Sequence, residues 1–109
     1  MERRRHSRIE ASHPVLYYSD IYPRPKVAAT LDLSLGGARI ETRSCLMQSE
    51  GLAISIAIQP HVIKCRGKVM YVLDSEGERL RAGVRFDGLS SQDSISLGQY
   101  LSSIMEQRA

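Results

Sequence analysis

The sequence has no tryptophan, one phenylalanine and only two cysteines among its 109 residues. Single-stranded nucleic acids stack on exposed aromatic side chains at strand centres, and few residues here could fill that role. The cysteines, Cys45 and Cys65, lack the spacing of metal ligands, so we expect two reduced structural thiols. Neither an HExxH pattern nor a G-x-S-x-G elbow occurs, so that no catalytic constellation is visible. These absences predict a protein that is not an enzyme and that holds no metal.

Long apolar stretches are missing as well. No run of about 20 apolar residues is present, and we therefore predict no membrane-spanning helix. The charged N-terminus is not followed by an apolar segment, which argues against a secretory signal and favours a cytoplasmic protein. A length of 109 residues corresponds to one domain, and a hydrophobic content of 42% is enough for a single core.

The excess positive charge is confined to the N-terminus. Four arginines, Arg3, Arg4, Arg5 and Arg8, stand among the first eight residues against one acidic residue, Glu2. The other eleven basic residues are balanced by eleven acidic ones, so the net charge of +3 belongs entirely to this arm. A cationic arm on a neutral body is suited to bind an anion such as a phosphate, a nucleic acid or an acidic lipid.

Alternation of apolar and polar residues dominates the middle of the chain and predicts strands. In the run 52–58 large and small residues alternate, and we expect its isoleucines to point inward. Gly67 is expected to mark a bend or bulge in a long strand. Short strands at hairpin spacing favour a barrel, which removes sheet edges. We predict an all-β fold, a six-stranded antiparallel β-barrel over 12–88, with strands at 14–19, 28–34, 38–42, 52–58, 62–73 and 79–86.

The two ends of the chain differ from this pattern. Ser90, with Asp93 three residues later, predicts the capped start of an α-helix over 89–107. Its apolar residues recur at helical spacing, and we expect them to pack on the barrel and close one end. The first 11 residues are expected to form a flexible basic arm. The predicted stripe of the helix consists of Leu97, Leu101, Ile104 and Met105.

The segment 32–37, Asp-Leu-Ser-Leu-Gly-Gly, offers polar groups at a strand end. Asp32 and Ser34 are two residues apart and would share one face of a strand. Gly36 and Gly37 follow directly, and glycine in a strand pattern indicates a bulge or a place where a ligand or another backbone comes close. Taken alone, the segment is more typical of a polar strand end with a Gly-Gly turn, since such pieces are common in soluble proteins.

Two motifs together resemble the PilZ domain, the bacterial receptor module for cyclic di-GMP. The first is a pair of arginines separated by three residues, here Arg4 and Arg8. The second is Asp/Asn-x-Ser-x-x-Gly, which matches 32–37. Their order and separation agree with the family, the segment 83–86 resembles its last barrel strand, and the tail resembles its C-terminal helix. The resemblance covers nearly the whole chain.

The resemblance implies a set of ligand contacts. Arginine can donate two hydrogen bonds to guanine O6 and N7, stack on the base, or bind a phosphate. A carboxylate is suited to accept from guanine N1–H and N2–H2, a hydroxyl can add a contact, and glycine, including Gly36, leaves room for the base. Tyr71 is either an aromatic beside the base or a core or rim tyrosine. Arg39 is expected to be a solvated strand arginine, with a place on the same surface as the motif as the alternative. The family positions carried over are Arg4, Arg8, Asp32, Ser34 and Gly37.

The number of ligands also depends on the arm. Family members take one cyclic di-GMP or a stacked pair, and the second molecule adds two negative charges. Arg3 precedes the first motif directly and supplies a further guanidinium, with Arg5 beside it. We therefore expect two ligand molecules per chain.

The resulting prediction is a non-enzymatic cyclic di-GMP receptor or adaptor, with no cofactor other than this ligand. Ligand binding is expected to change the conformation of the arm and so signal to a partner protein, which the sequence does not identify. Two alternatives remain open: a small basic barrel that binds nucleic acid, and a PilZ-like module that acts only through protein contacts.

Overall fold

The computed structural model describes residues 8–22, 24–74 and 77–108. Six of its strands coincide, within two residues at either end, with the six predicted from the sequence. A seventh, much shorter strand precedes them, and a helix follows. The elements are β1 (Ile9–Glu10), β2 (Pro14–Ser19), β3 (Lys26–Leu33), β4 (Gly37–Thr42), β5 (Gly51–Ala57), β6 (Val62–Asp74), β7 (Leu80–Asp87) and α1 (Ser91–Arg108).

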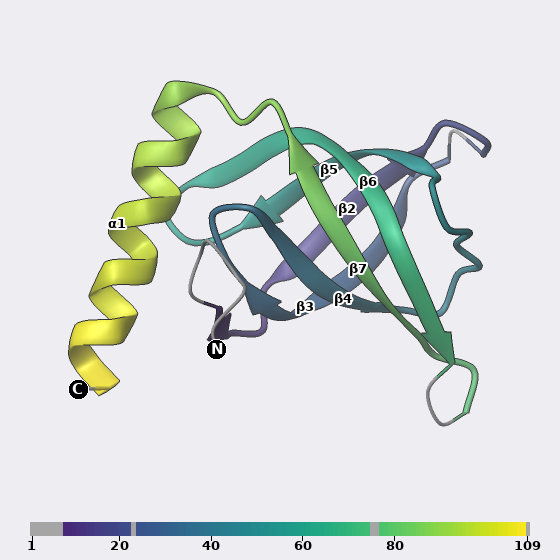
Figure 1. The fold of residues 1–109 in the computed structure, drawn as a ribbon, viewed down its shortest axis with the longest axis horizontal. Coiled ribbons are helices and arrows are strands. Elements are labelled where there is room, and N and C mark those ends of the chain that lie inside the picture. The colour runs from purple at the N-terminus through teal and green to yellow at the C-terminus, as the bar shows by residue number, and fades with distance from the viewer. Residues whose placement is uncertain (1–7, 23, 75–76, 109) are drawn as a thin grey trace, which may run out of the picture.

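The six long strands close into a barrel (Figure 1). They follow one another in the order β3-β2-β5-β6-β7-β4, and β4 pairs back with β3, which closes the barrel. Each of these pairings is antiparallel. The predicted all-β class and the six-stranded antiparallel barrel are therefore confirmed. Helix α1 stands beside one end of the barrel (Figure 1).

The strand β1 lies inside the segment 1–11 that we expected to be irregular. Ile9 and Glu10 pair with the end of β3, and Ile9 is 7% exposed. The buried side chain of Thr30 joins β1 to β2: its hydroxyl accepts from the backbone N–H of His13 at 2.9 Å and donates to the carbonyl of Ala11. A single isoleucine is thus enough to tie the end of the arm to the barrel, because β3 supplies the backbone partners. The rest of the predicted arm, residues 1–7, lies outside the described residues.

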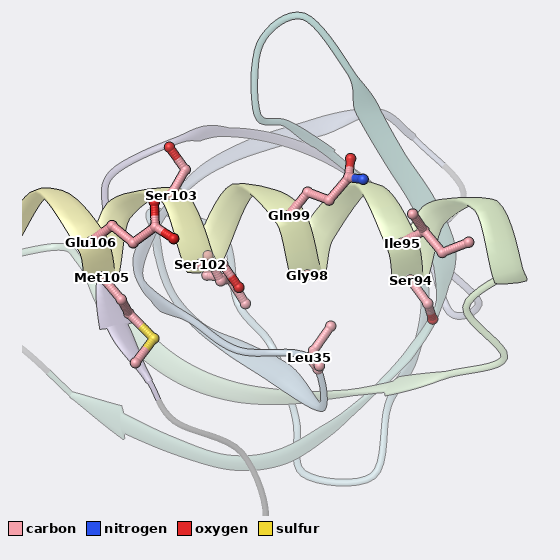
Figure 2. Close-up of a pocket in the computed structure, with 10 residues that line it drawn as sticks. Leu35, Ser94, Ile95, Gly98, Gln99, Ser102, Ser103, Met105 and Glu106 are labelled. Atoms are coloured by element: carbon pink, nitrogen blue, oxygen red, sulfur yellow. The ribbon is translucent and has the colours of Figure 1, made fainter.

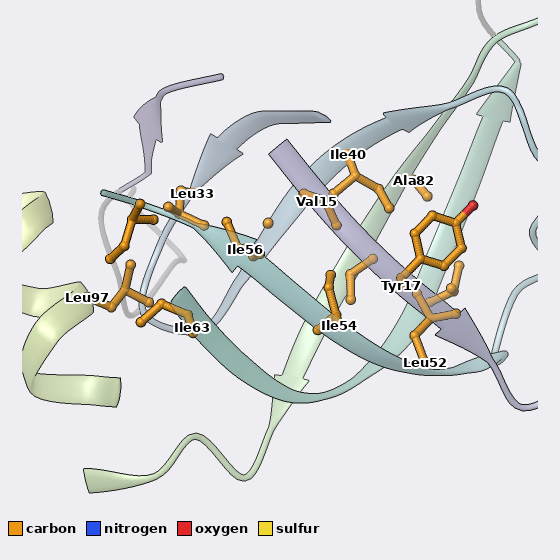
Figure 3. Packing of buried hydrophobic residues seen from close by; sticks show 14 of the residues in the cluster. Val15, Tyr17, Leu33, Ile40, Leu52, Ile54, Ile56, Ile63, Ala82 and Leu97 are labelled. Atoms are coloured by element: carbon orange, nitrogen blue, oxygen red, sulfur yellow. The ribbon is translucent and has the colours of Figure 1, made fainter. Parts of the chain in front are cut away.

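The barrel interior is filled by aliphatic side chains from every wall (Figure 3). Ile54, Ile56 and Ile58 are at most 2% exposed, so the predicted inward isoleucines are confirmed. Alternation along β5 places the small residues between them towards the outside. At the helix end of the barrel, Leu97 of α1 meets Ile63 (Figure 3).

Helix α1 begins after the predicted cap. The Ser90 hydroxyl accepts from the backbone N–H of Asp93 at 3.0 Å, as an N-cap does. The carboxylate of Asp93 does not complete a capping box, because it accepts from the backbone N–H of Lys64 at 3.3 Å and so fastens the helix to β6. Leu97 and Leu101 are buried, as predicted, whereas Met105 is 47% exposed. Its predicted burial is wrong, since it lies further round the helix than the stripe that faces the barrel.

The irregularity in β6 lies elsewhere than predicted. The register between β6 and β7 shifts between Val69 and Tyr71, which leaves Met70 in the bulge. Gly67 pairs regularly with Phe86 instead. A Cβ atom on Gly67 would stand 2.7 Å from a side-chain methyl group of Val84, so this glycine makes room for the core and does not bend the strand.

Candidate functional site

The carboxylate of Asp32 lies between two arginines at the end of β3. Nη1 of Arg8 stands 2.7 Å from Oδ1 of Asp32, and Nε of Arg39 stands 2.5 Å from Oδ2. The backbone N–H of Arg39 also donates to Oδ1 at 3.2 Å. Asp32 is 4% exposed, so these partners shield it from solvent on the outer side of the barrel. The two strands of one hairpin and a residue 24 positions earlier thus meet at one negative charge.

A tight hairpin produces this arrangement. The backbone N–H of Ser34 donates to the carbonyl of Gly37 at 2.9 Å, and the Ser34 hydroxyl accepts from the N–H groups of Gly36 and Gly37 at 3.2 Å. The turn places Asp32 opposite Arg39 in the antiparallel register of β3 and β4. The predicted site residue Ser34 therefore lies buried in the turn, where its hydroxyl holds the loop shape.

The charge state of Asp32 follows from its surroundings. Burial raises the pKa of the Asp32 carboxyl, but the hydrogen bonds and charges of Arg39 and Arg8 outweigh it, so that the pKa is lowered overall. The bond to Asp32 in turn raises the pKa of Arg39. The site therefore holds a carboxylate and two guanidinium groups at every physiological pH.

The two glycines of the motif have packing roles. A Cβ atom on Gly37 would stand 2.2 Å from the backbone carbonyl oxygen of Val84, a contact that no side chain can make. The carbonyl of Gly36 accepts from the backbone N–H of Phe86 at 2.9 Å. Gly37 thus lets the hairpin lie directly against β7, and the backbone of Gly36 is hydrogen-bonded to it. The predicted contact of these glycines with a base stays a prediction.

Tyr71 belongs to the same outer row of residues. Across neighbouring strands, Asp32 pairs with Arg39, Arg39 with Gly83, and Gly83 with Tyr71. The ring of Tyr71 lies over Gly83, since a Cβ atom there would come within 2.2 to 2.8 Å of three ring carbons. The Tyr71 side chain is 38% exposed, and its phenol acts electrostatically on Arg39. An aromatic face and an ion-paired carboxylate therefore occupy one surface.

The structure unites some predicted site residues and leaves others aside. Arg8, Asp32 and Tyr71 share this surface, while Ser34, Gly36 and Gly37 form the adjoining turn. Arg3, Arg4 and Arg5 lie outside the described residues. The sequence interpretation missed Arg39 as a partner of Asp32. The hairpin register contained the signal, because a turn over 34–37 places an acidic residue opposite a basic one.

A separate groove of about 640 Å³ lies on the helix side of this turn (Figure 2). Leu35, between the serine and the first glycine of the motif, points to the helix beneath Gly98 (Figure 2). Ile95 and Met105 border the groove towards its two ends and are 60% and 47% exposed. The groove is lined mainly by α1, and the charged cluster around Asp32 does not contribute to it.

Other chemistry is sparse. The described residues contain no group of three or more histidine, cysteine or acidic side chains able to hold a metal ion. In the same part of the chain, no helix has the length and apolar character needed to cross a membrane. Both cysteines are free. Burial, with Asp93 and Asp87 nearby, raises the pKa of the Cys65 thiol to about 11, which makes it a poor nucleophile.

Several solved structures share the fold of this chain. The PilZ domain of YcgR from Escherichia coli with c-di-GMP is 20% identical, with a TM-score of 0.78 over 98% of this chain and 95% of that one. The Bacillus subtilis inhibitor of motility MotI/DgrA is 16% identical, with a TM-score of 0.82 over 100% and 55%. The MrkH–c-di-GMP complex of K. pneumonia is 13% identical, with a TM-score of 0.76 over 99% and 55%.

This chain therefore spans about half the length of MotI/DgrA and of MrkH. No curated protein sequence matches it significantly. The PilZ domain family model matches residues 2–103, which include both motifs and all seven strands. From this match and the barrel that agrees with it, the chain belongs to the PilZ domain family.

Proposed function

We propose that this protein is a cytoplasmic receptor for cyclic di-GMP that acts by binding and not by catalysis. The observation that carries the proposal is the Asp32 carboxylate, kept ionised beside Arg8 of the first family motif. Two relatives of the same fold, the PilZ domain of YcgR and MrkH, have been solved with c-di-GMP. Membership of the family supports the same ligand here.

The residues have complementary chemical roles in this proposal. Asp32 accepts hydrogen bonds from guanine, since a carboxylate matches its N1–H and N2–H2 donors. Arg8 and Arg4 bind the guanine O6 and N7 edge or the ring phosphates. Tyr71 offers a partly exposed ring beside the carboxylate, on which a base can stack.

The arm carries the signal in this proposal. Its arginines bind the ligand and fold over it, which changes the surface that the protein presents to a partner. The partner is a protein, whichever process it regulates.

Calorimetric titration with cyclic di-GMP, GTP and a short oligonucleotide tests the proposal. Of the three compounds, we expect only cyclic di-GMP to bind. Asp32→Ala should weaken this binding by roughly 1–3 kcal/mol, the contribution of a good guanine contact. Asp20→Ala is the matched control, because Asp20 also pairs with an arginine, Arg66 at 2.5 Å, but outside the motif. Preference for the oligonucleotide, or equal affinity in both variants, would contradict the receptor assignment.

The stoichiometry is a separate prediction. We hypothesise that two cyclic di-GMP molecules bind per chain, because Arg3 adds a cation and a planar donor next to Arg4. Arg3→Leu should lower the calorimetric ratio from two towards one while the unfolding temperature stays unchanged. Arg24→Leu removes the same charge from an exposed position in the β2–β3 loop and should leave the ratio at two. A wild-type ratio of one at saturation would refute the pair and leave the receptor assignment intact.

A further inference from the structure

The two arginines that hold Asp32 do so unequally. Arg39 contributes two donors from strand β4, its Nε to Oδ2 at 2.5 Å and its backbone N–H to Oδ1 at 3.2 Å. Arg8 contributes one, Nη1 to Oδ1 at 2.7 Å. Arg39 thus occupies Oδ2 with its side chain, whereas the side chain of Arg8 occupies Oδ1.

Arg8 is also incompletely satisfied. Its Nε is buried and finds no hydrogen-bond acceptor among the described residues. A buried donor without an acceptor is destabilising, so the bound position of Arg8 is weakened by its own geometry. Arg8 also precedes the two-residue strand β1, while Arg39 lies within a six-residue strand that is paired on both sides.

This asymmetry separates a fixed partner from an exchangeable one. Asp32 is only 4% exposed because its partners cover it, so guanine can reach the carboxylate only if one of the present donors moves away. Arg8 has fewer bonds to lose and an unused donor to gain. Arg39 is held by the strand that carries it.

We propose, on the basis of the proposed function, that Arg39 is the positioning residue of the site. It holds Oδ2 of Asp32 while the ligand displaces Arg8 from Oδ1, and the freed guanidinium of Arg8 then binds the ligand. Arg39 keeps the carboxylate oriented in both states and need not touch the ligand. In the ligand-free protein Arg8 thus occupies Asp32, and ligand binding exchanges this partner for guanine.

The surroundings predict how this role can be measured. The charged and titratable groups that face the pair are Arg8 before β1, Glu10 on β1 and Tyr71 on β6. Without the Arg39 side chain, burial favours protonation of Asp32 and only Arg8 opposes it. In the wild type the pKa of Asp32 lies below the usual 3.8, so the carboxylate persists at pH 5 and above.

Titration with cyclic di-GMP at pH 7.5 and pH 5.0 tests the role of Arg39. The wild-type affinity should be constant over this range. Arg39→Gln should bind about tenfold more weakly at pH 7.5, the effect of losing a hydrogen bond to a charged group. It should bind measurably more weakly at pH 5.0 than at pH 7.5, as Asp32 takes up a proton. Arg39→Lys, which keeps the charge but lacks the side-on Nε donor, should be intermediate at pH 7.5.

One control variant and one direct measurement separate the positioning of Asp32 from the general loss of an arginine ion pair. Arg81→Gln removes an arginine that pairs with Glu41 at 3.3 Å on adjoining strands, and should change neither the affinity nor its pH profile. The ¹³Cγ titration of Asp32 should give a higher pKa in Arg39→Gln than in the wild type. His13, hydrogen-bonded to Tyr100 at 2.6 Å, is also titratable. It is present in every variant, so it cannot account for a difference in pH dependence between them.

The outcomes distinguish the two levels of the argument. A wild-type protein that does not bind cyclic di-GMP overturns the proposed function. A wild-type protein that binds, with Arg39→Gln equal to it in affinity at both pH values, overturns the positioning role alone. A fall in affinity that is identical at both pH values, with an unchanged Asp32 titration, also overturns it, because Arg39 would then bind the ligand directly.

Discussion

Deletion of residues 1–8 is expected to abolish cyclic di-GMP binding while the barrel stays folded. The deletion removes Arg4 and Arg8, the first family motif, and with them all of the excess positive charge. It leaves Ile9, whose buried side chain is the first contribution to the core. Calorimetry should detect no heat of binding, and the unfolding temperature should change by only a few degrees, since a small domain shifts about 4–8 °C per kcal/mol.

Ile9→Ala in the chain with residues 1–8 retained is the control for the fold. It keeps every arginine but truncates a buried isoleucine, and should cost roughly 2–4 kcal/mol of stability. Trypsin offers a second measurement, because ligand should slow cleavage at the arginines of the arm. Retained affinity in the shortened chain would show that the barrel binds the ligand without the arm. Loss of its cooperative unfolding would show that the first eight residues belong to the fold.

Replacement of Gly37 by alanine is expected to destabilise the barrel strongly. The added methyl group would stand 2.2 Å from the carbonyl oxygen of Val84 and 3.2 Å from the Cα of Arg85, both backbone atoms of β7. Neither can turn aside as a side chain would, so β4 and β7 must separate. Overpacking of this kind costs typically 1–3 kcal/mol and more where backbone is involved, from a total of about 5–15 kcal/mol. Urea denaturation measures the loss directly.

Gly98→Ala is the matched control for Gly37. The nearest atom to its added methyl group would be Cδ2 of Leu35, at an ordinary contact distance of 3.9 Å. Alanine is favoured over glycine within a helix by about 1 kcal/mol, so α1 should become slightly more stable. Opposite signs for the two substitutions are expected. Equal stability of Gly37→Ala and the wild type would contradict the close approach of β4 and β7.

Much of the architecture could be predicted because local patterns report it. Period-two alternation locates the six long strands, since one face of each strand must be buried. Ser90 predicts the start of α1, because its hydroxyl satisfies a backbone N–H that the helix itself leaves unpaired. The motif at Asp32 could likewise be assigned to a strand end and a turn, from its residues alone.

The errors arose where packing between distant segments decides the outcome. Ile9 is the only apolar side chain in residues 2–9, and its burial depends on β3, more than 20 residues later. Gly67 was expected to bend β6, yet the residue that needs its space is Val84 on the neighbouring strand. Met105 fits the helical spacing but lies further round the helix than the stripe that packs on the barrel.

The sequence by itself determined which segments are strands, where the chain turns, and that its excess positive charge lies beside the first arginine motif. These properties depend on neighbours within a few residues, because alternation, turn hydrogen bonds and caps are local. Only the tertiary structure decided that Arg8 and Arg39 would share one carboxylate. The register of the β3–β4 hairpin is local, but the position of Arg8 beside the buried Asp32 requires β1 to pair with β3, and that pairing joins residues more than 20 positions apart.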